Sequence, residues 1–262
     1  MTKTLPPITP KQQAMLKLLY KYRFLNRTQL QTLLAHKDKR RIITWLKDLR
    51  EKEYIDWQYD STNFIAKSQP AIYCLSLNGI KHLRSLSEYR TDELRKRYKD
   101  SNRTQVFIKR CLLIADYSIV LIAKSDDKVQ YTFSLPADYI DPTNPHHYLS
   151  ELKPHLYFSR RQGSDTMEYL LENFEQTLPR YQLRKRLKDY IEYLASGGWN
   201  AAKGSAPIAL FICANTADLL YVKRRTKKLL EEGWLDEGLH LRVTTLDKVR
   251  ISGVASKIWE EI

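Results

Sequence analysis

Apolar residues between positions 10 and 54 recur at intervals of three and four, the spacing of helices that bury one face. The first predicted helix begins at Thr9-Pro10. Thr9 would be its N-cap, and Pro10 suits the first turn because its missing N–H has no partner there. A second predicted helix covers Arg27 to Ala35. The pattern therefore predicts a small helical unit at the start of the chain.

The third predicted helix runs from Asp38 to Tyr54 and has two different faces. Ile43, Leu46 and Leu49 are three residues apart, so we expect them on its inner face. Basic and hydroxyl residues precede the helix or occupy its other face: Lys37, Lys39, Arg40, Arg41, Thr44 and Lys47. A DNA major groove admits one helix, and the N-terminal side chains of that helix meet the base edges first. We expect this helix to bind duplex DNA.

After the third helix the pattern changes to that of short strands. Ile55 to Tyr59 and Pro70 to Ser76 are predicted strands, joined by a polar segment from Asp60 to Gln69. Two such strands with a polar tip form a β-wing, and Asn78-Gly79 then opens a helix over 80–86. The wing completes the element order of a winged helix-turn-helix.

Two further basic residues are candidate DNA contacts. Lys67 lies near the wing tip, where it can meet a phosphate, and Arg27 begins the second helix. Residues 1–85 hold 16 of the chain's 44 Lys and Arg but only 6 of its 30 Asp and Glu, which is +10 of the net +14. A local basic excess neutralises phosphates and releases counterions, so it supports binding to nucleic acid.

Length and composition indicate a globular protein of two domains, with 262 residues of which 43% are hydrophobic. No apolar run is long enough to cross a membrane, and the N-terminus lacks a signal-peptide core, so we expect a cytoplasmic protein. Cys74, Cys111 and Cys213 are widely spaced within apolar runs, which favours buried thiols over disulfides or a zinc site.

The charged segment 87–103 is predicted to be a helical connector between the winged helix of residues 1–86 and a second domain of residues 104–262. In the second domain an apolar helix over 106–123 precedes alternating strands and helices. Strands are expected at 129–135, 155–159, 167–173, 207–213 and 239–245, and helices at 183–194 and 215–232. The predicted fold class is α/β (α+β), with a winged helix-turn-helix followed by a mixed α/β domain.

Several of these segments together resemble the replication-relaxation family of plasmid and mobile-element proteins. The resemblance rests on the segments 73–79 (YCLSLNG), 153–158 (KPHLYF), 169–175 (YLLENFE) and 186–190 (RLKDY), and on the strand and helix that follow Pro207. It implies a winged helix followed by a domain similar to the restriction-endonuclease-like core. It also implies a role in replication, DNA relaxation or plasmid mobilisation.

A nuclease core of that kind needs a Pro-Asp, an acid on the next strand and a nearby Lys, so that carboxylates hold Mg²⁺ and the Lys helps to activate water. Here the corresponding positions hold Pro154-His155, Glu172 and Arg186. A single carboxylate holds Mg²⁺ poorly, and arginine, which stays protonated, is a poor proton acceptor. We therefore predict no catalytic site, metal or cofactor, and expect Arg186 to pair with Glu172. Asp138 is the candidate for a missing acid, and Lys185 or Lys188 for a base, if the domain is active.

Other DNA-processing chemistries are poorly matched. A rolling-circle relaxase needs two His separated by one residue, whereas His146 and His147 are adjacent, and the chain has no Gly-x-x-x-x-Gly-Lys phosphate loop. The sequence thus predicts a non-catalytic, homodimeric protein that binds a specific duplex site, as a regulator or as the DNA-recognition component of a replication or mobilisation complex. The alternatives are a metal-dependent DNA nickase and a scaffold whose second domain binds a protein partner.

Overall fold

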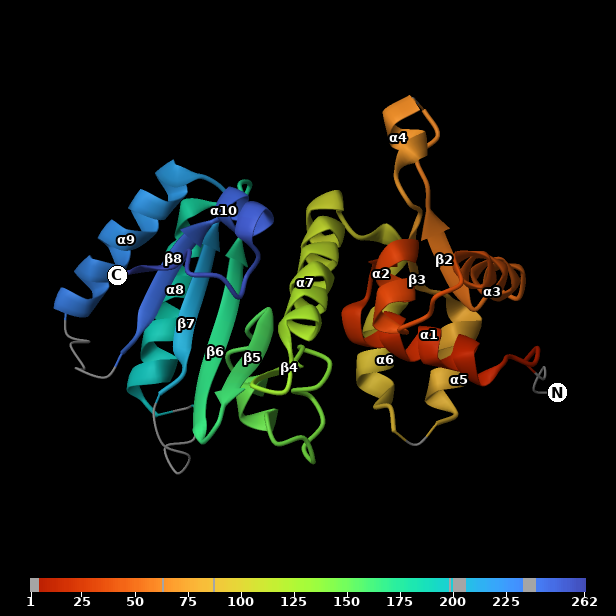
Figure 1. The fold of residues 1–262 in the computed structure, drawn as a ribbon, viewed down its shortest axis with the longest axis horizontal. Coiled ribbons are helices and arrows are strands. Elements are labelled where there is room, and N and C mark those ends of the chain that lie inside the picture. Colours follow the sequence, from red (N-terminus) through yellow and green to blue (C-terminus); the bar gives the residue numbers. More distant parts are fainter. Residues whose placement is uncertain (1–4, 63, 87, 198, 200–205, 233–238) are drawn as a thin grey trace. The chain divides into compact units, whose positions relative to one another are not determined.

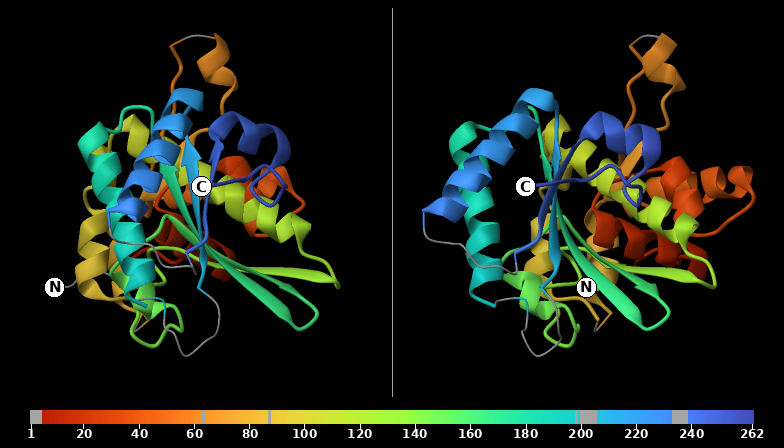
Figure 2. Two further views of the ribbon diagram at one scale, coloured as in Figure 1. Left: turned by 90° about the vertical axis from the view of Figure 1, so that its left-hand side faces the viewer. Right: turned by 60° about the vertical axis from the view of Figure 1, so that its left-hand side comes forward.

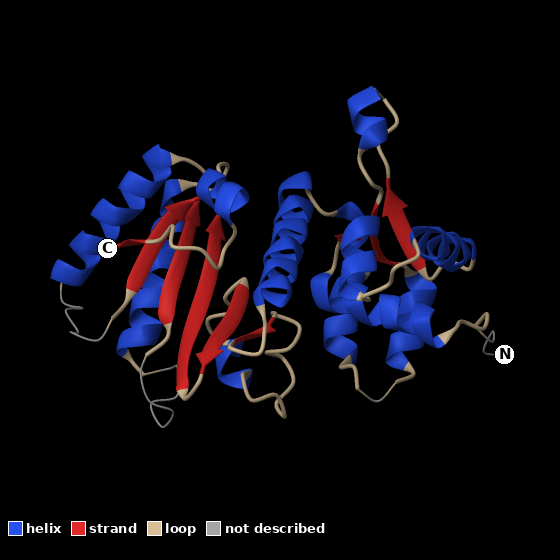
Figure 3. Ribbon diagram, viewed as in Figure 1, coloured by secondary structure: helices blue, strands red, loops and turns tan. Residues whose placement is uncertain are grey.

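The computed structural model describes residues 5–62, 64–86, 88–197, 199, 206–232 and 239–262 (Figures 1 and 3). The first four residues, residue 63 of the predicted wing tip and residue 87 at the start of the predicted connector lie outside the described residues, as do 198, 200–205 and 233–238. The chain divides into two compact units, Met1–Ile119 and Val120–Ile262. This division falls inside a helix, further along the chain than the predicted connector at 87–103.

The first unit has the element order of a winged helix-turn-helix (Figure 1). Its helices are α1 (Pro10–Tyr22), α2 (Arg27–Leu33), α3 (Lys39–Glu51), α4 (Phe64–Ser68), α5 (Leu77–Arg84), α6 (Thr91–Arg97), the 3-10 helix η1 (Asp100–Asn102) and most of α7 (Gln105–Lys124). Its strands are β1 (Leu25–Asn26), β2 (Ile55–Gln58) and β3 (Ile72–Leu75). They form an antiparallel sheet in the order β1-β3-β2.

Local capping explains where the first helices begin. The predicted N-cap Thr9 is confirmed, because its side chain and that of Gln12 each bond the other's backbone N–H in a capping box. Asn26 and Gln29 repeat this arrangement at the start of α2. The Gln29 amide also donates to the Leu112 carbonyl at 2.9 Å and to Asp116 Oδ1 at 2.7 Å. These two bonds attach α2 to α7, and most of the long helix belongs to the first unit.

The ends of the helices differ from the predictions for local reasons. Ala35 and Glu53 adopt positive φ values of 48° and 57°, so α2 and α3 end earlier than predicted. Gly79 lies inside α5 and does not open it, because the helix begins at Leu77. A Cβ at Gly79 would lie 2.2 Å from the Tyr54 carbonyl oxygen. Glycine is needed here for close packing of two backbones rather than for a turn.

The second unit is a mixed α/β domain, as predicted. Its strands are β4 (Val129–Ser134), β5 (Leu156–Gln162), β6 (Asp165–Phe174), β7 (Ile208–Cys213), β8 (Leu241–Thr245) and β9 (Glu260–Glu261). The other elements are the 3-10 helix η2 (His147–Ser150) and the helices α8 (Arg180–Ala195), α9 (Thr216–Glu231) and α10 (Leu246–Ser252). The sheet follows chain order from β4 to β9; β6, β7 and β8 are parallel, and the other neighbouring pairs are antiparallel.

Helices α8 and α9 cover one face of this sheet (Figure 2). Their apolar side chains pack on strand residues such as Leu170, Phe174 and Phe211 to form the main core of the unit. Strand β7 is buried along its whole length, which is why its sequence is continuously apolar. The hairpin between β5 and β6 turns at Gly163, which has a φ of 61°. The turn is shorter than the polar turn predicted over 160–166, and both strands are therefore longer than predicted.

Candidate nucleic-acid interface

Helix α3 begins at a charged cap and carries most of the predicted DNA contacts. Asp38 is the N-cap, and its Oδ1 accepts from the backbone N–H groups of Arg40 and Arg41 at 2.8 and 3.2 Å. These bonds lower the pKa of Asp38, which keeps its carboxylate ionised beside the positive end of the helix. The cap therefore holds the first turn of α3, with its two arginines, in helical geometry.

The outer face of α3 is basic and exposed. The predicted contacts Lys37, Lys39, Arg40, Arg41, Thr44 and Lys47 all lie on it or directly before it. Lys37, Lys39 and Arg40 form no ion pair with any residue in the described part of the chain. Lys47 Nζ lies 3.8 Å from Glu51 Oε1, and both side chains are exposed, so the pair is weak. This face offers its positive charge to an anionic partner.

The inner face of α3 corrects one prediction. Ile42, Leu46 and Leu49 are buried, whereas Ile43 is 43% exposed on the basic face. The spacing of 42, 46 and 49 follows the helical period of 3.6 better than a strict three-residue spacing does. Sequence reasoning thus placed Ile43 in the core, and the structure places it beside Arg40, Thr44 and Lys47.

The wing follows α3 and consists of β2, β3 and the segment between them, which contains Lys67. The predicted polar tip holds the short helix α4, in which Lys67 is exposed. The hydroxyl of Tyr59, next to β2, donates to the Lys67 carbonyl at 3.1 Å. This bond ties the tip back to the strand that leads to it. Arg27 is half-buried in the first turn of α2.

Sequence reasoning missed an aromatic cluster between α3 and the wing. The rings of Trp57 and Tyr59 stack with their centroids 5.6 Å apart and their planes at 3°, and both side chains are exposed. The Arg50 guanidinium carbon lies 4.2 Å from the Trp57 ring centroid. Trp57 and Tyr59 alternate on one face of a predicted strand, which was the available signal. The structure adds Arg50, from the last turn of α3, to that pair.

At the positions where the family resemblance implies a nuclease site in the second unit, the Glu172 side chain of β6 is paired with residues of α8. Arg186 Nε and Nη2 donate to its two carboxylate oxygens at 2.9 and 3.0 Å, and the Tyr190 hydroxyl donates to Oε2 at 2.9 Å. His155 Nε2 lies 3.6 Å from Oε1, while its Nδ1 accepts the backbone N–H of Asn173. The predicted pairing of Arg186 with Glu172 is confirmed.

The electrostatics of this cluster favour a permanent ion pair. Burial alone would raise the pKa of Glu172, but the charges of His155 and Arg186 and the hydrogen bonds from Arg186 and Tyr190 outweigh it, so the pKa is lowered. Arg186 also donates to the carbonyls of Leu152 and Lys153. Four hydrogen bonds from Arg186 and both carboxylate oxygens of Glu172 are therefore engaged within the protein.

The other residues considered for nuclease chemistry do not join Glu172. Asp138 Oδ2 accepts the backbone N–H of Leu135 at 2.8 Å, Lys185 is exposed on α8, and Lys188 pairs with Glu192. Within the described ranges, no group of three or more His, Cys, Asp or Glu side chains is arranged to hold a metal ion. The Glu172 carboxylate is held instead by Arg186 and Tyr190.

Two smaller findings concern the cysteines and the membrane. All three cysteines are free, with Cys74 and Cys213 buried and Cys111 half-buried. Burial raises the pKa of each thiol, to about 12 for Cys74 and Cys213 and to about 11 for Cys111.

Among the residues that the structure describes, no helix combines the length and apolarity needed to cross a lipid bilayer.

The protein thus has two units: the first has the element order of a winged helix-turn-helix, and the second is a mixed α/β domain with a buried ion pair between Glu172 and Arg186. The chain belongs to the replication-relaxation family, which it matches over residues 16–208. This match confirms the family expected from the sequence.

Comparison with other proteins adds two solved structures. Restriction endonuclease FokI matches with a TM-score of 0.29 and 12% identity, over 92% of this chain and 43% of that one. FokI bound to DNA matches with a TM-score of 0.27 and 12% identity, over 93% and 44%. The chain thus spans less than half the length of these proteins. No curated protein matches it.

Proposed function

We propose that this protein binds a specific site in duplex DNA through α3 and the wing. It acts as a non-catalytic regulator, or as the DNA-recognition component of a complex that replicates or mobilises a plasmid or other mobile element. Membership of the replication-relaxation family supports the link to replication. The observation that carries the proposal is the outer face of α3, where exposed basic side chains accompany Thr44 and Ile43.

The chemistry of that face suits base recognition as well as phosphate binding. An arginine can donate to two acceptors of a guanine, and an apolar side chain can contact a thymine methyl group. Arg40 supplies the first kind of group and Ile43 the second, on one exposed helix surface. Lys67 on the wing and Arg27 on α2 supply charge for phosphates, which orients the protein but carries no sequence information.

The second unit takes a structural role in this proposal rather than a hydrolytic one. Metal-assisted hydrolysis needs carboxylate oxygens that are free to hold the ion. Both oxygens of Glu172 accept hydrogen bonds from Arg186, and one also accepts from Tyr190. A cation would have to displace a guanidinium to bind there.

We further propose that the protein works as a homodimer, because winged-helix proteins often place two recognition helices on adjacent half-sites. The proposal predicts a target with two related half-sites about one helical turn apart. Sedimentation of the protein with and without its target DNA measures the number of chains on that target.

The decisive experiment is a map of bound sites across the DNA of the source, followed by footprinting of the strongest one. The proposal expects one or a few protected duplex sites whose affinity far exceeds that of unrelated sequence. Uniform protection without a preferred site would contradict it. A parallel assay incubates supercoiled plasmid with the protein and Mg²⁺ or Mn²⁺. Nicking that disappears in Glu172→Ala would support the nickase alternative. The scaffold alternative would be supported if the second unit captured a protein partner and the protein did not bind DNA.

A further inference from the structure

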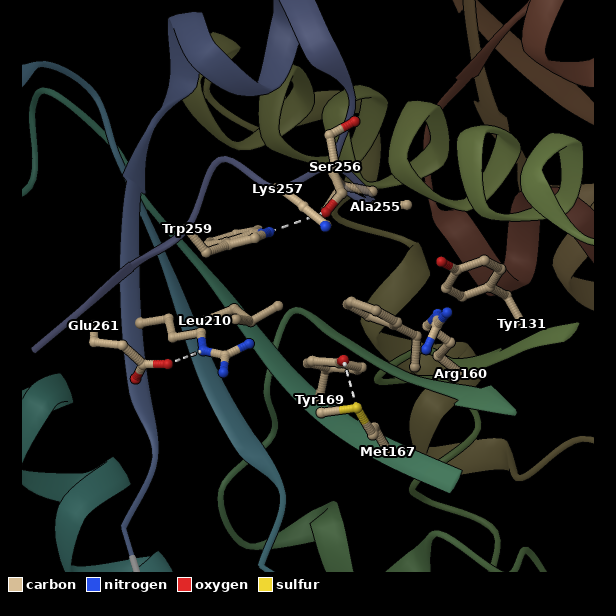
Figure 4. A pocket seen from close by; sticks show the side chains of 13 residues that line it. Tyr131, Arg160, Met167, Tyr169, Leu210, Ala255, Ser256, Lys257, Trp259 and Glu261 are labelled. Carbon is tan, nitrogen blue, oxygen red and sulfur yellow. Dashed lines mark hydrogen bonds and ion pairs between the residues drawn. The ribbon is translucent and has the colours of Figure 1, made fainter. Parts of the chain in front are cut away.

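The sheet of the second unit has a pocket on the face opposite α8 and α9. The pocket has a volume of about 490 Å³, within the usual range of small-ligand sites, and is partly open to solvent (Figure 4). Its walls come from all six strands of the sheet and from the segment between α10 and β9. This pocket lies on the other side of the sheet from Glu172 and its partners, so it is separate from the nuclease position.

The floor of the pocket is aromatic. Phe158 and Tyr169 are direct cross-strand partners, and their rings stack with centroids 4.6 Å apart and planes at 17°. Tyr131, on the neighbouring strand, continues the row with its ring 6.4 Å from that of Phe158. Three adjacent strands therefore present ring faces and edges to the same space.

Trp259 faces this floor from the other side of the pocket (Figure 4). Its indole Nε1–H donates to the Val254 carbonyl at 3.1 Å, which satisfies the only polar group of the ring. The indole is half-buried. What it offers to a ligand is an apolar ring face held in position by that hydrogen bond.

Three cationic side chains complete the lining. Arg160 comes from β5, Arg242 from β8 and Lys257 from the segment before β9. Arg242 Nε donates to Glu261 Oε1 at 2.7 Å, and Glu261 is the only acid among the residues lining the pocket. Burial raises the pKa of the Tyr169 hydroxyl, and the nearby charges of Arg242 and Arg160 partly offset that rise. The pocket is therefore both aromatic and net positive.

We infer that this pocket binds a nucleotide, with the base stacked against Trp259 and the aromatic floor and the phosphate held by Arg160 and Lys257. Aromatic rings accept any base because every base has a π face, and cations beside them bind the phosphate. An uncharged apolar ligand would use the rings but would leave the guanidinium and ammonium groups without a counterion. The inference does not depend on α3, because all of the residues involved lie in the second unit.

The test uses the full-length protein and two probes, deoxyadenosine monophosphate and a short single-stranded oligodeoxyadenylate. Calorimetry measures binding of the first and fluorescence anisotropy measures binding of the second. Trp259→Ala removes the ring, whereas Trp259→Phe keeps an aromatic face; both lose the hydrogen bond to Val254. Arg160→Gln removes one cation, and Arg250→Gln removes an exposed arginine outside the pocket as a matched control.

The inference expects Trp259→Ala to weaken binding at least about fivefold, in line with the usual worth of one stacked base. Trp259→Phe and Arg250→Gln should bind like wild type, and Arg160→Gln should weaken binding and lower its salt dependence. If both probes respond, the pocket takes a free nucleotide; if only the oligonucleotide responds, it takes a nucleotide within a strand. Either result supports the inference.

Three results would overturn it. The first is no measurable binding of either probe by the wild-type protein. The second is equal loss with Trp259→Ala and Trp259→Phe, which would assign the effect to the lost hydrogen bond rather than to stacking. The third is wild-type affinity in both Trp259→Ala and Arg160→Gln. Circular dichroism of each variant verifies that it is folded, and failure of duplex binding by α3 would leave these outcomes unchanged.

Discussion

Arg186 of α8 meets Glu172 of β6 with two parallel hydrogen bonds of 2.9 and 3.0 Å, inside the position where the resemblance implies a nuclease site. A planar guanidinium matches a carboxylate in this geometry, and lysine cannot reproduce it. These two residues therefore join a strand of the sheet to the helix that covers it.

Glu172→Ala should destabilise the protein by about 3 kcal/mol, because it leaves the Arg186 charge partly buried without its partner. Duplex DNA binding by the first unit should be unchanged. Urea unfolding followed by circular dichroism measures the free energy, and anisotropy measures the binding. Glu192→Ala, which removes the half-buried partner of Lys188 on α8, is the matched control and should have little effect.

The stabilisation from Glu172 should also depend on pH. The pKa of this carboxyl is lowered from its ordinary value of 4.5 in the folded protein, so the unfolded chain takes up a proton first as the pH falls. The contribution is complete above pH 4.5 and is lost as the pH falls through the folded-state pKa. The difference in unfolding free energy between wild type and Glu172→Gln should shrink over that range. A difference that grew towards acid pH would contradict the ion pair.

Arg40→Ala and Arg41→Ala should each weaken specific duplex binding by about 1–3 kcal/mol if that side chain contacts a base. The double variant Arg224→Ala/Arg250→Ala removes two exposed arginines from the second unit and is the control for net charge. Anisotropy on the mapped site and on an unrelated duplex separates specific from general loss. Wild-type affinity in Arg40→Ala/Arg41→Ala would mean that α3 does not recognise the DNA.

Lys67→Ala should weaken binding to all duplex sequences alike, because a phosphate contact carries no sequence information. The slope of log affinity against log salt should fall in magnitude by about 1. Titrations at several salt concentrations on specific and unrelated duplexes measure both effects. Selective loss on the specific site would instead make Lys67 a base contact.

Ile43→Ala and Leu46→Ala form a matched pair on one helix, since Ile43 is exposed and Leu46 is buried. Leu46→Ala should cost about 2–5 kcal/mol of stability through lost burial and a cavity. Ile43→Ala should leave stability nearly unchanged and reduce affinity for the mapped site. Thermal unfolding and anisotropy together distinguish the two variants. Equal destabilisation by both would indicate that Ile43 packs in the core, as the sequence predicted.

A fragment of residues 1–124 should fold and bind DNA, whereas residues 1–86 should be much less stable. The shorter fragment lacks Asp100, which pairs with Arg23, and Ile108, which packs on Phe24 and Cys74. It also lacks the α7 groups that accept from Gln29. Circular dichroism and anisotropy on both fragments test this, and equal stability would place the domain boundary at residue 86 as the sequence suggested.

Local sequence determined much of the fold. Thr9 and Asn26 cap their helices through reciprocal hydrogen bonds with the residue three positions further along the chain. A contact between residues so close in sequence can be predicted from the sequence. The element order of the winged helix, the long apolar helix α7 and the buried strand β7 followed from the same kind of periodic pattern. The basic face of α3 could also be predicted, because the basic residues and the helical spacing of the apolar residues both lie within one short segment.

Tertiary structure alone decided which residues meet across the chain. Adjacent isoleucines at 42 and 43 fit a periodic pattern almost equally, and only packing against the rest of the unit buries one of them. Glycine at 79 depends on the carbonyl of Tyr54, and the attachment of α7 to the first unit depends on Gln29. The pocket beside Trp259 gathers side chains from six strands and the segment before β9. Such contacts join residues far apart in sequence, so the local spacing of apolar and polar residues does not predict them.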